Sequence, residues 1–218
     1  MNVNHVLFRY TETDLIISLM KILKAYDVDT ALHSERVSML AGKIAQQLNL
    51  SSFQTKGLKI GALLHDIGKL AIPLNTLNTP VKLSEETFNL VKNHPKIGSE
   101  LLNHIHFPWP VTKMIEQHHE KIDGSGYPYG LKGSQICFEA KIIAVADLFD
   151  ALYSKRAYKQ SIELDLVIQI INESKGTKYD ETVLLALENI IKKDIYQLSE
   201  VEYQSQYQIQ HLKSYLSL

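Results

Sequence analysis

The sequence contains very little cysteine, a single residue in 218, Cys137. One thiol cannot form an internal disulfide, which excludes a disulfide-stapled scaffold and agrees with a reducing compartment. The chain also lacks an apolar run of about 18 residues, the length that a membrane-spanning helix needs. Its first ten residues lack the charged-then-apolar order of a signal peptide. We therefore expect a soluble chain in the cytoplasm, without a membrane partner.

Neither sign of charge is in excess. The 23 lysines and arginines nearly balance 24 aspartates and glutamates, which gives a net charge of −1 and an isoelectric point near 6.8. Such a chain has no positive field that would attract a DNA or RNA polymer. An anionic substrate must therefore be held by a few local charges.

Alternating strand patterns are also missing, whereas helical patterns are frequent. Apolar residues recur every three or four positions in the early part of the chain. The predicted helices cover residues 12–26, 30–48, 53–69, 84–94, 111–120, 139–153, 164–171 and 182–191. The stretch 139–153 is apolar on nearly every side, so it should be the most buried of them. This pattern predicts an all-α fold.

Several of the nine histidines stand close to carboxylates. His65 and Asp66 follow a largely apolar helical stretch, where charge is costly to bury unless a cation balances it. A His-Asp pair alone is common, and a surface or hydrogen-bonded role would then be the better interpretation. The next residues make a binding role more specific, because Gly68 allows a close backbone approach and Lys69 adds an ammonium.

A second group of donors lies further along the chain. His118 and His119 stand directly before a glycine-rich loop, and His33, His94 and Asp147 add more nitrogen and oxygen donors. Helical packing could bring these side chains together. Imidazole and carboxylate without thiolate favour iron, manganese or zinc over a thiophilic metal.

Five segments resemble the HD-GYP family, a branch of the HD superfamily of metal-dependent phosphohydrolases. They occur in family order and cover roughly residues 29 to 159. The segments are HSERV from His33, HDIGK from His65, NHPKIG from Asn93, HHEKIDGSGYP from His118 and EAKIIAVADLFDAL from Glu139. The resemblance implies a compact, multi-helix HD-domain bundle with a metal site in its helical core.

The chain is expected to divide into three parts. Residues 1–28 form an N-terminal helical segment that packs on the core, and residues 29–196 form the HD-GYP catalytic domain. Residues 197–218, rich in glutamine, tyrosine and serine, form a C-terminal helix or tail.

The resemblance also assigns metal ligands. It implies two divalent ions, with iron as the first expectation and manganese as the next, and Asp66 bridging them. The implied ligands are His33, His65, Asp66, His94, His118, His119 and Asp147. Some family members bind a third ion through a glutamate four residues before the first histidine. Asp29 stands there, on the same helical face, so it either holds a third ion or has a capping or solvated role.

Hydrolysis of cyclic di-GMP to pGpG, GMP or both is the implied reaction. Two adjacent ions would turn a bridging water into hydroxide, the expected nucleophile, near neutral pH. Asp66 and Lys69 are the expected catalytic residues, with Lys69 stabilising charge on a phosphoryl oxygen. Asp150 lies three residues after Asp147 on one helical face, so it is expected to orient a ligand histidine.

Substrate contacts are expected directly after the last of these segments. Arg156, Tyr158 and Lys159 combine cations, which bind phosphate, with a ring that can stack on guanine. The alternative for such residues is an ordinary solvated face. Family members carry a DRPYRK-like segment here, and this chain departs from it with Lys155 before the arginine and Ala157 in place of proline. These changes could alter affinity or nucleotide choice.

Gly126, Tyr127 and Pro128 form the loop that gives the family its name. The sequence offers no direct chemistry for this loop, which either shapes the lip of the pocket or binds a protein partner. A homodimer is also open. Two other functions remain alternatives: an HD-type phosphohydrolase of another cyclic dinucleotide, and a module that senses cyclic di-GMP without hydrolysing it.

Overall fold

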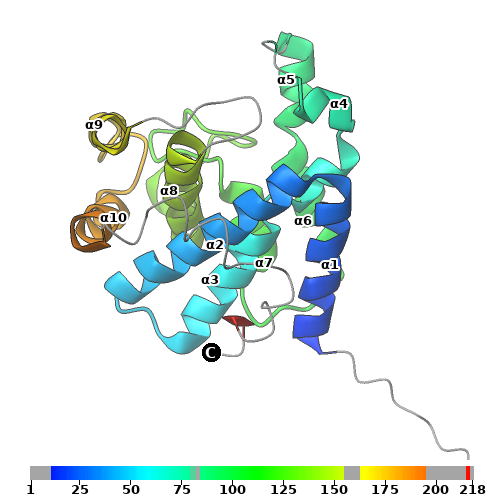
Figure 1. Cartoon of the computed structure of the whole chain (residues 1–218), viewed down its shortest axis with the longest axis horizontal. Coiled ribbons are helices and arrows are strands. Elements are labelled where there is room, and N and C mark those ends of the chain that lie inside the picture. The colour runs from blue at the N-terminus through cyan, green and yellow to red at the C-terminus, as the bar shows by residue number, and fades with distance from the viewer. Residues whose placement is uncertain (1–10, 80, 82–83, 155–162, 195–214, 217–218) are drawn as a thin grey trace, which may run out of the picture.

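The computed structural model in Figure 1 describes residues 11–79, 81, 84–154, 163–194 and 215–216. Within these residues the regular structure is helical, and β-structure is limited to two isolated bridges. The prediction of an all-α fold is therefore confirmed. The elements are α1 (Glu12–Tyr26), α2 (Val28–Gln47), α3 (Ser52–Leu64), η1 (Ile67–Ala71), α4 (Leu74–Leu77), α5 (Glu85–Val91), α6 (His94–Leu102), α7 (Val111–Gln117), η2 (Gly133–Gln135), α8 (Phe138–Tyr153), α9 (Leu164–Glu173) and α10 (Glu181–Asp194).

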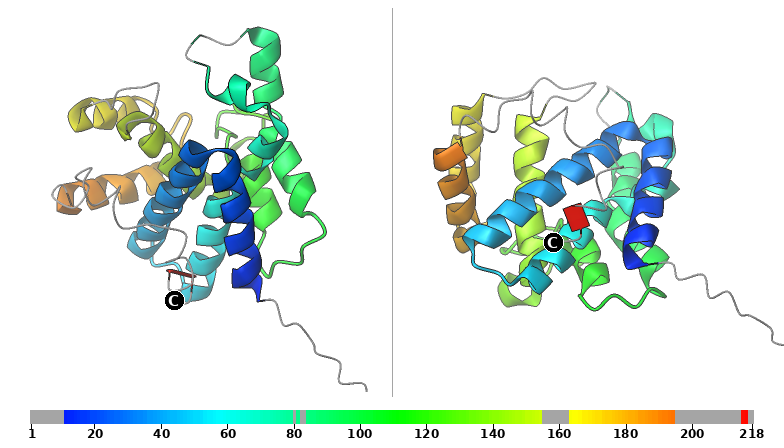
Figure 2. Two further views of the ribbon diagram at one scale, coloured as in Figure 1. Left: turned by 45° about the vertical axis from the view of Figure 1, so that its right-hand side comes forward. Right: turned by 60° about the horizontal axis from the view of Figure 1, so that its bottom comes forward.

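Helix α2 runs through the middle of the bundle and packs against α3, α8 and α1 (Figure 1). Helices α9 and α10 lie beside α8 at one side, and α4 and α5 project from the opposite side (Figure 2). Neither α4 nor α5 contains a buried residue. Within the described residues, no helix combines the length and apolarity needed to cross a membrane. The core therefore centres on α2, and α4 and α5 form an arm outside it.

Helix starts follow local capping chemistry. Thr11 caps α1 and Ser51 caps α3, each through a capping box in which the residue three positions later bonds back. Asp27 ends α1 and caps α2, because its side chain accepts a hydrogen bond from the backbone of Asp29. The turn between α1 and α2 is therefore short and defined by a single side chain.

The expectation for the most buried helix was wrong. Nine of the 13 residues of α3 are buried, against eight of the 16 residues of α8. Helix α3 lies between α2, α7 and α1, whereas the start of α8 is open and Phe138 is 37% exposed. An apolar sequence allows a helix to be buried, but the number of helices packed around it decides which fraction of its residues is buried.

Three predicted helices run three or more residues past their observed ends, and each overrun contains a histidine. The helix expected over 53–69 ends at Leu64, the one expected over 84–94 ends at Val91, and the one expected over 111–120 ends at Gln117. The helix α6 that follows begins at His94 with Pro95 in its first turn. Proline lacks the N–H that would bond to Val91, so the preceding helix cannot continue through it.

Glu35 on α2 is a buried carboxyl group with an exposure of 4%. Neither of its oxygens forms a hydrogen bond within the described part of the chain. Burial raises its pKa to about 7, although Lys24 and Arg36 act in the opposite direction. The folded chain therefore holds this proton over a pH range in which the unfolded chain, with a pKa near 4.5, has lost it.

We expect Glu35→Gln to stabilise the chain at pH 8 and to have little effect near pH 5. A raised folded-state pKa contributes stability below the unfolded pKa, and this stability is lost as pH rises through about 7. The gain at pH 8 is at most about 3 kcal/mol, since one pKa unit corresponds to about 1.4 kcal/mol. Urea unfolding at both pH values measures it, with the exposed Glu86→Gln as control. An equal effect at both pH values would contradict this assignment.

Candidate metal centre

Three of the predicted ligand histidines lie directly at or after a helix end. In each, the ring Nδ1 lies within hydrogen-bond distance of the carbonyl oxygen three residues earlier: His65 to Ala62 at 2.7 Å, His94 to Val91 at 2.8 Å, and His118 to Ile115 at 2.6 Å. A carbonyl only accepts, so Nδ1 carries the proton and donates. Each Nε2 is then left with a free lone pair, which is the form that binds a metal.

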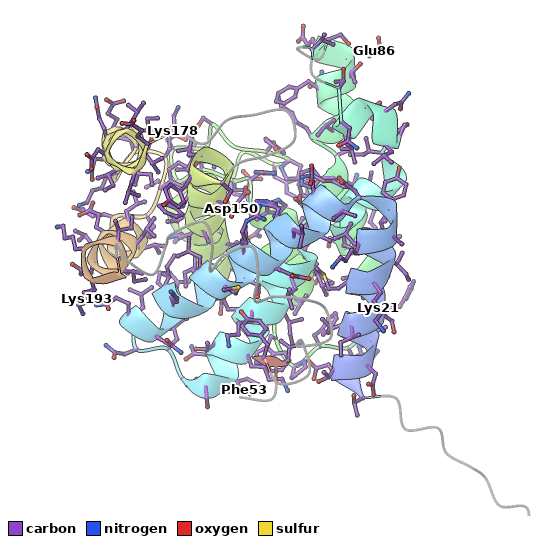
Figure 3. The ribbon with its side chains drawn as sticks, in the orientation of Figure 1. Lys21, Phe53, Glu86, Asp150, Lys178 and Lys193 are labelled. Carbon is purple, nitrogen blue, oxygen red and sulfur yellow. The ribbon has the colours of Figure 1, made fainter. Side chains whose placement is uncertain are left out.

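His33 reaches the same place from α2. Its Nδ1 lies 2.6 Å from Asp150 Oδ2, and Arg36 donates to both oxygens of Asp150, at 2.7 and 3.0 Å. These bonds hold the pKa of Asp150 below its usual range although burial acts to raise it. Figure 3 shows Asp150 inside the bundle, between α8 and α2. The structure therefore gives His33 a charged partner that fixes the direction of its Nε2.

The donor atoms form two groups, each with its atoms within 4.8 Å of one another. The first contains His33, His65 and Asp66, and the second contains His94, His118 and His119. Asp66 lies between them, because Oδ1 is 3.1 Å from His94 Nε2 while Oδ2 is 3.3 Å from His65 Nε2. Asp147 also faces both groups, with Oδ1 3.0 Å from His33 Nε2 and Oδ2 3.8 Å from His119 Nδ1.

Gly68 makes the approach of Asp66 to His94 possible. A Cβ at this position would lie 2.0 Å from the carbonyl oxygen of His94 and 2.6 Å from the backbone nitrogen of Gly98. Both distances are too short for any side chain, so η1 can pack on α6 only with glycine here. The sequence predicted a close backbone approach at Gly68, and the structure shows that the backbone approached is the start of α6.

The protonation states suit metal binding. Burial lowers the pKa of His118 well below its usual range and that of His119 to about 3, so both rings are neutral near pH 7. Burial alone would raise the pKa of Asp66 and Asp147. The charge of Lys69 beside Asp66, and the imidazoles of His33 and His119 beside Asp147, hold both pKa values well below the usual range. The centre therefore offers neutral imidazoles at His118 and His119 together with ionised carboxylates. At His65, burial, which lowers the pKa, is outweighed by the charge of Asp66, and the pKa is raised.

The arrangement fits divalent cations. His65 Nε2 and Asp66 Oδ1 are buried and form no hydrogen bond within the described residues, and such atoms are rare in folded proteins. His94 Nε2 lies 3.2 Å from His118 Nε2 as well as 3.1 Å from Asp66 Oδ1. Because Nδ1 carries the proton in both rings, these pairs bring lone pairs together, which is unfavourable unless a cation lies between them. Nitrogen and oxygen donors of this kind suit first-row divalent metals.

Two predicted residues lie beside the centre in different ways. Lys69 Nζ lies 2.6 Å from Asp66 Oδ2 and donates to it, so its ammonium faces the donor groups. Asp29 is half-buried in the first turn of α2 and belongs to neither donor group. Its role in binding a third ion stays a prediction.

Comparison with known protein families matches residues 18–183 to the HD domain. The chain belongs to the HD domain family. The family resemblance inferred from the five motifs is therefore confirmed. Divalent metal ions are the cofactors that this HD domain and its two donor groups imply.

Relatives of this HD domain have named activities. The cyclic di-GMP phosphodiesterase response regulator RpfG of Xanthomonas campestris is 40% identical over 81% of this chain and 47% of its own length. The 3'3'-cGAMP-specific phosphodiesterase 3 of Vibrio cholerae is 36% identical over 81% of this chain and 38% of its own length. Among solved structures, Bd1817, an HDG"Y"P protein from Bdellovibrio bacteriovorus, aligns over 83% of this chain and 61% of its own, with a TM-score of 0.63 and 26% identity. The chain spans less than half of both phosphodiesterases.

The Gly126–Pro128 loop of this HD domain borders the donor groups. The Tyr127 ring packs against His119, with centroids 4.7 Å apart and ring planes inclined by 33°, and the Tyr127–Pro128 peptide is cis. Glu120 is 3% exposed, and its carboxylate accepts from the backbone N–H groups of Tyr129 and Leu131. A Cβ on Gly126 would lie 2.4 Å from the Glu120 Cα. The loop is therefore folded tightly onto the segment that carries His118 and His119.

Sequence reasoning missed three residues around the centre. Arg36 holds Asp150, Glu120 anchors the loop, and Lys92 Nζ lies 4.7 Å from the Phe88 ring centre and 5.7 Å from that of Tyr127. Arg36 and Glu120 were within quoted motifs, and a charged residue beside a candidate ligand was the available signal. For Lys92 the sequence held no such signal, because its contact with Tyr127 joins residues 35 positions apart and depends on the fold. Arg156, Tyr158 and Lys159 lie outside the described residues.

We expect Asp150→Asn to weaken metal binding by about 10–100-fold, because a ligand histidine loses its charged partner. Its fold should remain, since asparagine has the same shape. Competition with a chelator of known affinity measures the change, and Asp165→Asn on the exposed face of α9 is the matched control. Wild-type metal affinity in Asp150→Asn would show that Asp150 serves only the packing of α2 on α8.

Proposed function

We propose that this chain is a metal-dependent phosphodiesterase that hydrolyses cyclic di-GMP in the cytoplasm, to pGpG, GMP or both. The observation that carries the proposal is the Asp66 carboxylate between two groups of imidazoles. Such a carboxylate suits two ions a few Å apart, the arrangement that many phosphodiester-cleaving enzymes share. Relatives named as cyclic di-GMP phosphodiesterases support the choice of substrate.

The proposed ligands fall into two sets. His33, His65 and Asp147 would hold one ion, and His94, His118 and His119 the other, with Asp66 shared. We propose iron first and manganese next, since the donors are nitrogen and oxygen without thiolate. When bound, two such ions supply charge neutralisation at the phosphate and a water of lowered pKa as nucleophile.

The chain's own residues would complete the chemistry. The Lys69 ammonium, 2.6 Å from Asp66 Oδ2, is close enough to the centre to donate to a non-bridging phosphoryl oxygen as negative charge grows there. Asp150, held by Arg36, would keep His33 oriented through the reaction, since it contacts the ring at Nδ1 and leaves Nε2 free to bind the ion. The buried setting excludes much of the competing water.

Substrate contacts would come from two sides. Lys92 and Tyr127 form a cation-and-ring pair next to His119, which suits a phosphate and a stacked base. Arg156, Tyr158 and Lys159 remain proposed contacts from the segment after α8. The Gly126–Pro128 loop as a protein-binding surface, the third ion at Asp29 and a homodimer stay predictions.

We also propose the three-part division of the chain, with residues 29–196 as the catalytic domain between segments 1–28 and 197–218. Supporting this, most of the family match and both donor groups fall inside 29–196.

A second candidate substrate is 3'3'-cGAMP. It is favoured by the relative from Vibrio cholerae that is named for this molecule. The two substrates share the phosphodiester linkage and differ in one base, so the metal centre alone does not discriminate between them. Measured rates on both compounds decide the preference.

We expect Asp66→Ala to lose turnover of cyclic di-GMP and to bind less metal than the wild type. The fall should exceed the roughly 10–100-fold effect of losing an outer partner of a ligand, because the shared carboxylate has no substitute. Elemental analysis and chromatography of the products measure both, with Asp165→Ala as control. An active, metal-loaded Asp66→Ala protein would refute the proposal. A wild-type protein that binds metal and nucleotide without turnover would indicate a sensor instead.

We expect Lys92→Met to raise KM for cyclic di-GMP by about tenfold or more without lowering metal content. Loss of a hydrogen bond from a charged donor costs about 1.5–3 kcal/mol, and about 1.4 kcal/mol is a factor of ten. The exposed Lys96→Met, four positions further along the chain in α6, is the matched control. An unchanged KM would remove Lys92 from the substrate site.

A further inference from the structure

A second binding site is suggested by a cavity of about 270 Å³ between α2, the start of α3 and Tyr215. Figures 1 and 2 show residues 215–216, in red, beside α3 and away from the arm of α4 and α5. None of the described residues that line it belongs to the metal centre. We call it the Lys59 pocket, and its polar lining comes from Gln46, Ser52, Thr55, Lys56, Lys59 and Tyr215.

Lys59 is held in the wall of this pocket by its neighbours. Its exposure is only 7%. The stem crosses α2 at Gly42, where a Cβ would lie 2.8 Å from Lys59 Cε. Nζ lies 4.1 Å from the centre of the Tyr215 ring, and the hydroxyl of that tyrosine is 3.1 Å from Ser38 Oγ. The Lys59 side chain is therefore held in one position between Gly42, which its stem contacts, and the Tyr215 ring, which its ammonium faces.

The charge of Lys59 has no counter-ion within the described residues. No carboxylate or other hydrogen-bond acceptor among them pairs with its ammonium, and its contact is the face of Tyr215. Burial lowers its pKa. One contact with a ring recovers only part of the cost of removing an ammonium from water. A buried cation in this state indicates that an anion completes the site.

The other polar groups of the pocket also favour an anion. Lys56 adds a second lysine, whose Nζ also lies 5.7 Å from the centre of the Trp109 ring, and Gln46 adds an amide. Ser52 and Thr55 offer hydroxyls from the first turn of α3, where the partial positive charge of the helix end lies. Among the residues that the structure describes, the lining contains no carboxylate, histidine or cysteine, so this set does not suit a metal ion.

We infer that the Lys59 pocket binds a small phosphate-bearing molecule, with Lys59 and Lys56 balancing its charge. A phosphate group has the negative charge and the several acceptor oxygens that two ammoniums and two hydroxyls require. The volume lies just below the range of roughly 300–1,000 Å³ typical of sites for drug-sized ligands, which favours a ligand no larger than a mononucleotide. The inference does not depend on the proposed phosphodiesterase activity.

Amine-reactive labelling of the intact protein tests this site residue by residue, with inorganic phosphate as the probe. The labelling rate of Lys59 is measured by peptide mass spectrometry in phosphate and in chloride at equal ionic strength. We expect phosphate to slow the labelling of Lys59 at least fivefold and to leave the exposed Lys21 on α1 unchanged. Equal rates for Lys59 in both buffers would overturn the proposal, and so would equal slowing at Lys21.

The variant Lys59→Met separates this pocket from phosphate bound at the metal centre. If phosphate binds, it raises the Tm of the folded protein. Methionine keeps most of the lysine stem and removes the charge, so the rise in Tm caused by phosphate should be smaller in Lys59→Met than in the wild type. Any part of the rise that comes from phosphate at the metal centre should remain. Lys21→Met is the matched control and should keep the whole rise. An undiminished rise in Lys59→Met would assign all phosphate binding to another site and refute the proposal. The labelling result stands by itself if this variant does not fold.

Discussion

The carboxylate of Asp66 is buried among imidazole nitrogens, and the surrounding structure is arranged around this placement. It requires α3 to end at Leu64, because a continued helix would direct Asp66 elsewhere. It requires Gly68, since no other residue allows η1 to approach the start of α6. It also requires the rings of His65 and His94, whose Nδ1 protons are held by backbone carbonyls so that their Nε2 lone pairs face the carboxylate. Local backbone chemistry thus sets the geometry of the centre.

The helix ends explain both what the sequence could predict and what it could not. Helical spacing and capping residues were sufficient for the all-α class and for most helices, including α1, whose bounds agree with the expectation. The same spacing extended three helices past their ends, because His65, His94 and His118 do not break an apolar pattern. Their rings cap the last carbonyls of these helices, which is a tertiary arrangement. Helix α6 was missed since its start depends on Pro95 and the freed carbonyl of Val91.

Motif order pointed to the donor residues, and the structure brings seven of them together, but distances needed the fold. The sequence could not tell that Asp147 contacts His33 or that Arg36 holds Asp150, because each of these contacts joins residues more than 100 positions apart. Because the net charge is close to zero, we expect anions to be bound by individual lysines and arginines and not by an overall positive charge. Lys69 and Lys92 are such cations near the centre, and Lys59 is another in a separate place.

We propose that the Asp66 carboxylate joins two metal ions. Electron paramagnetic resonance of the protein loaded with Mn²⁺ tests it most directly, together with a count of bound ions. Two ions per chain with a spin-coupled spectrum are predicted, since ions that share the Asp66 carboxylate lie close enough to interact. A single bound ion, or two ions with the spectrum of isolated Mn²⁺, would contradict the shared centre.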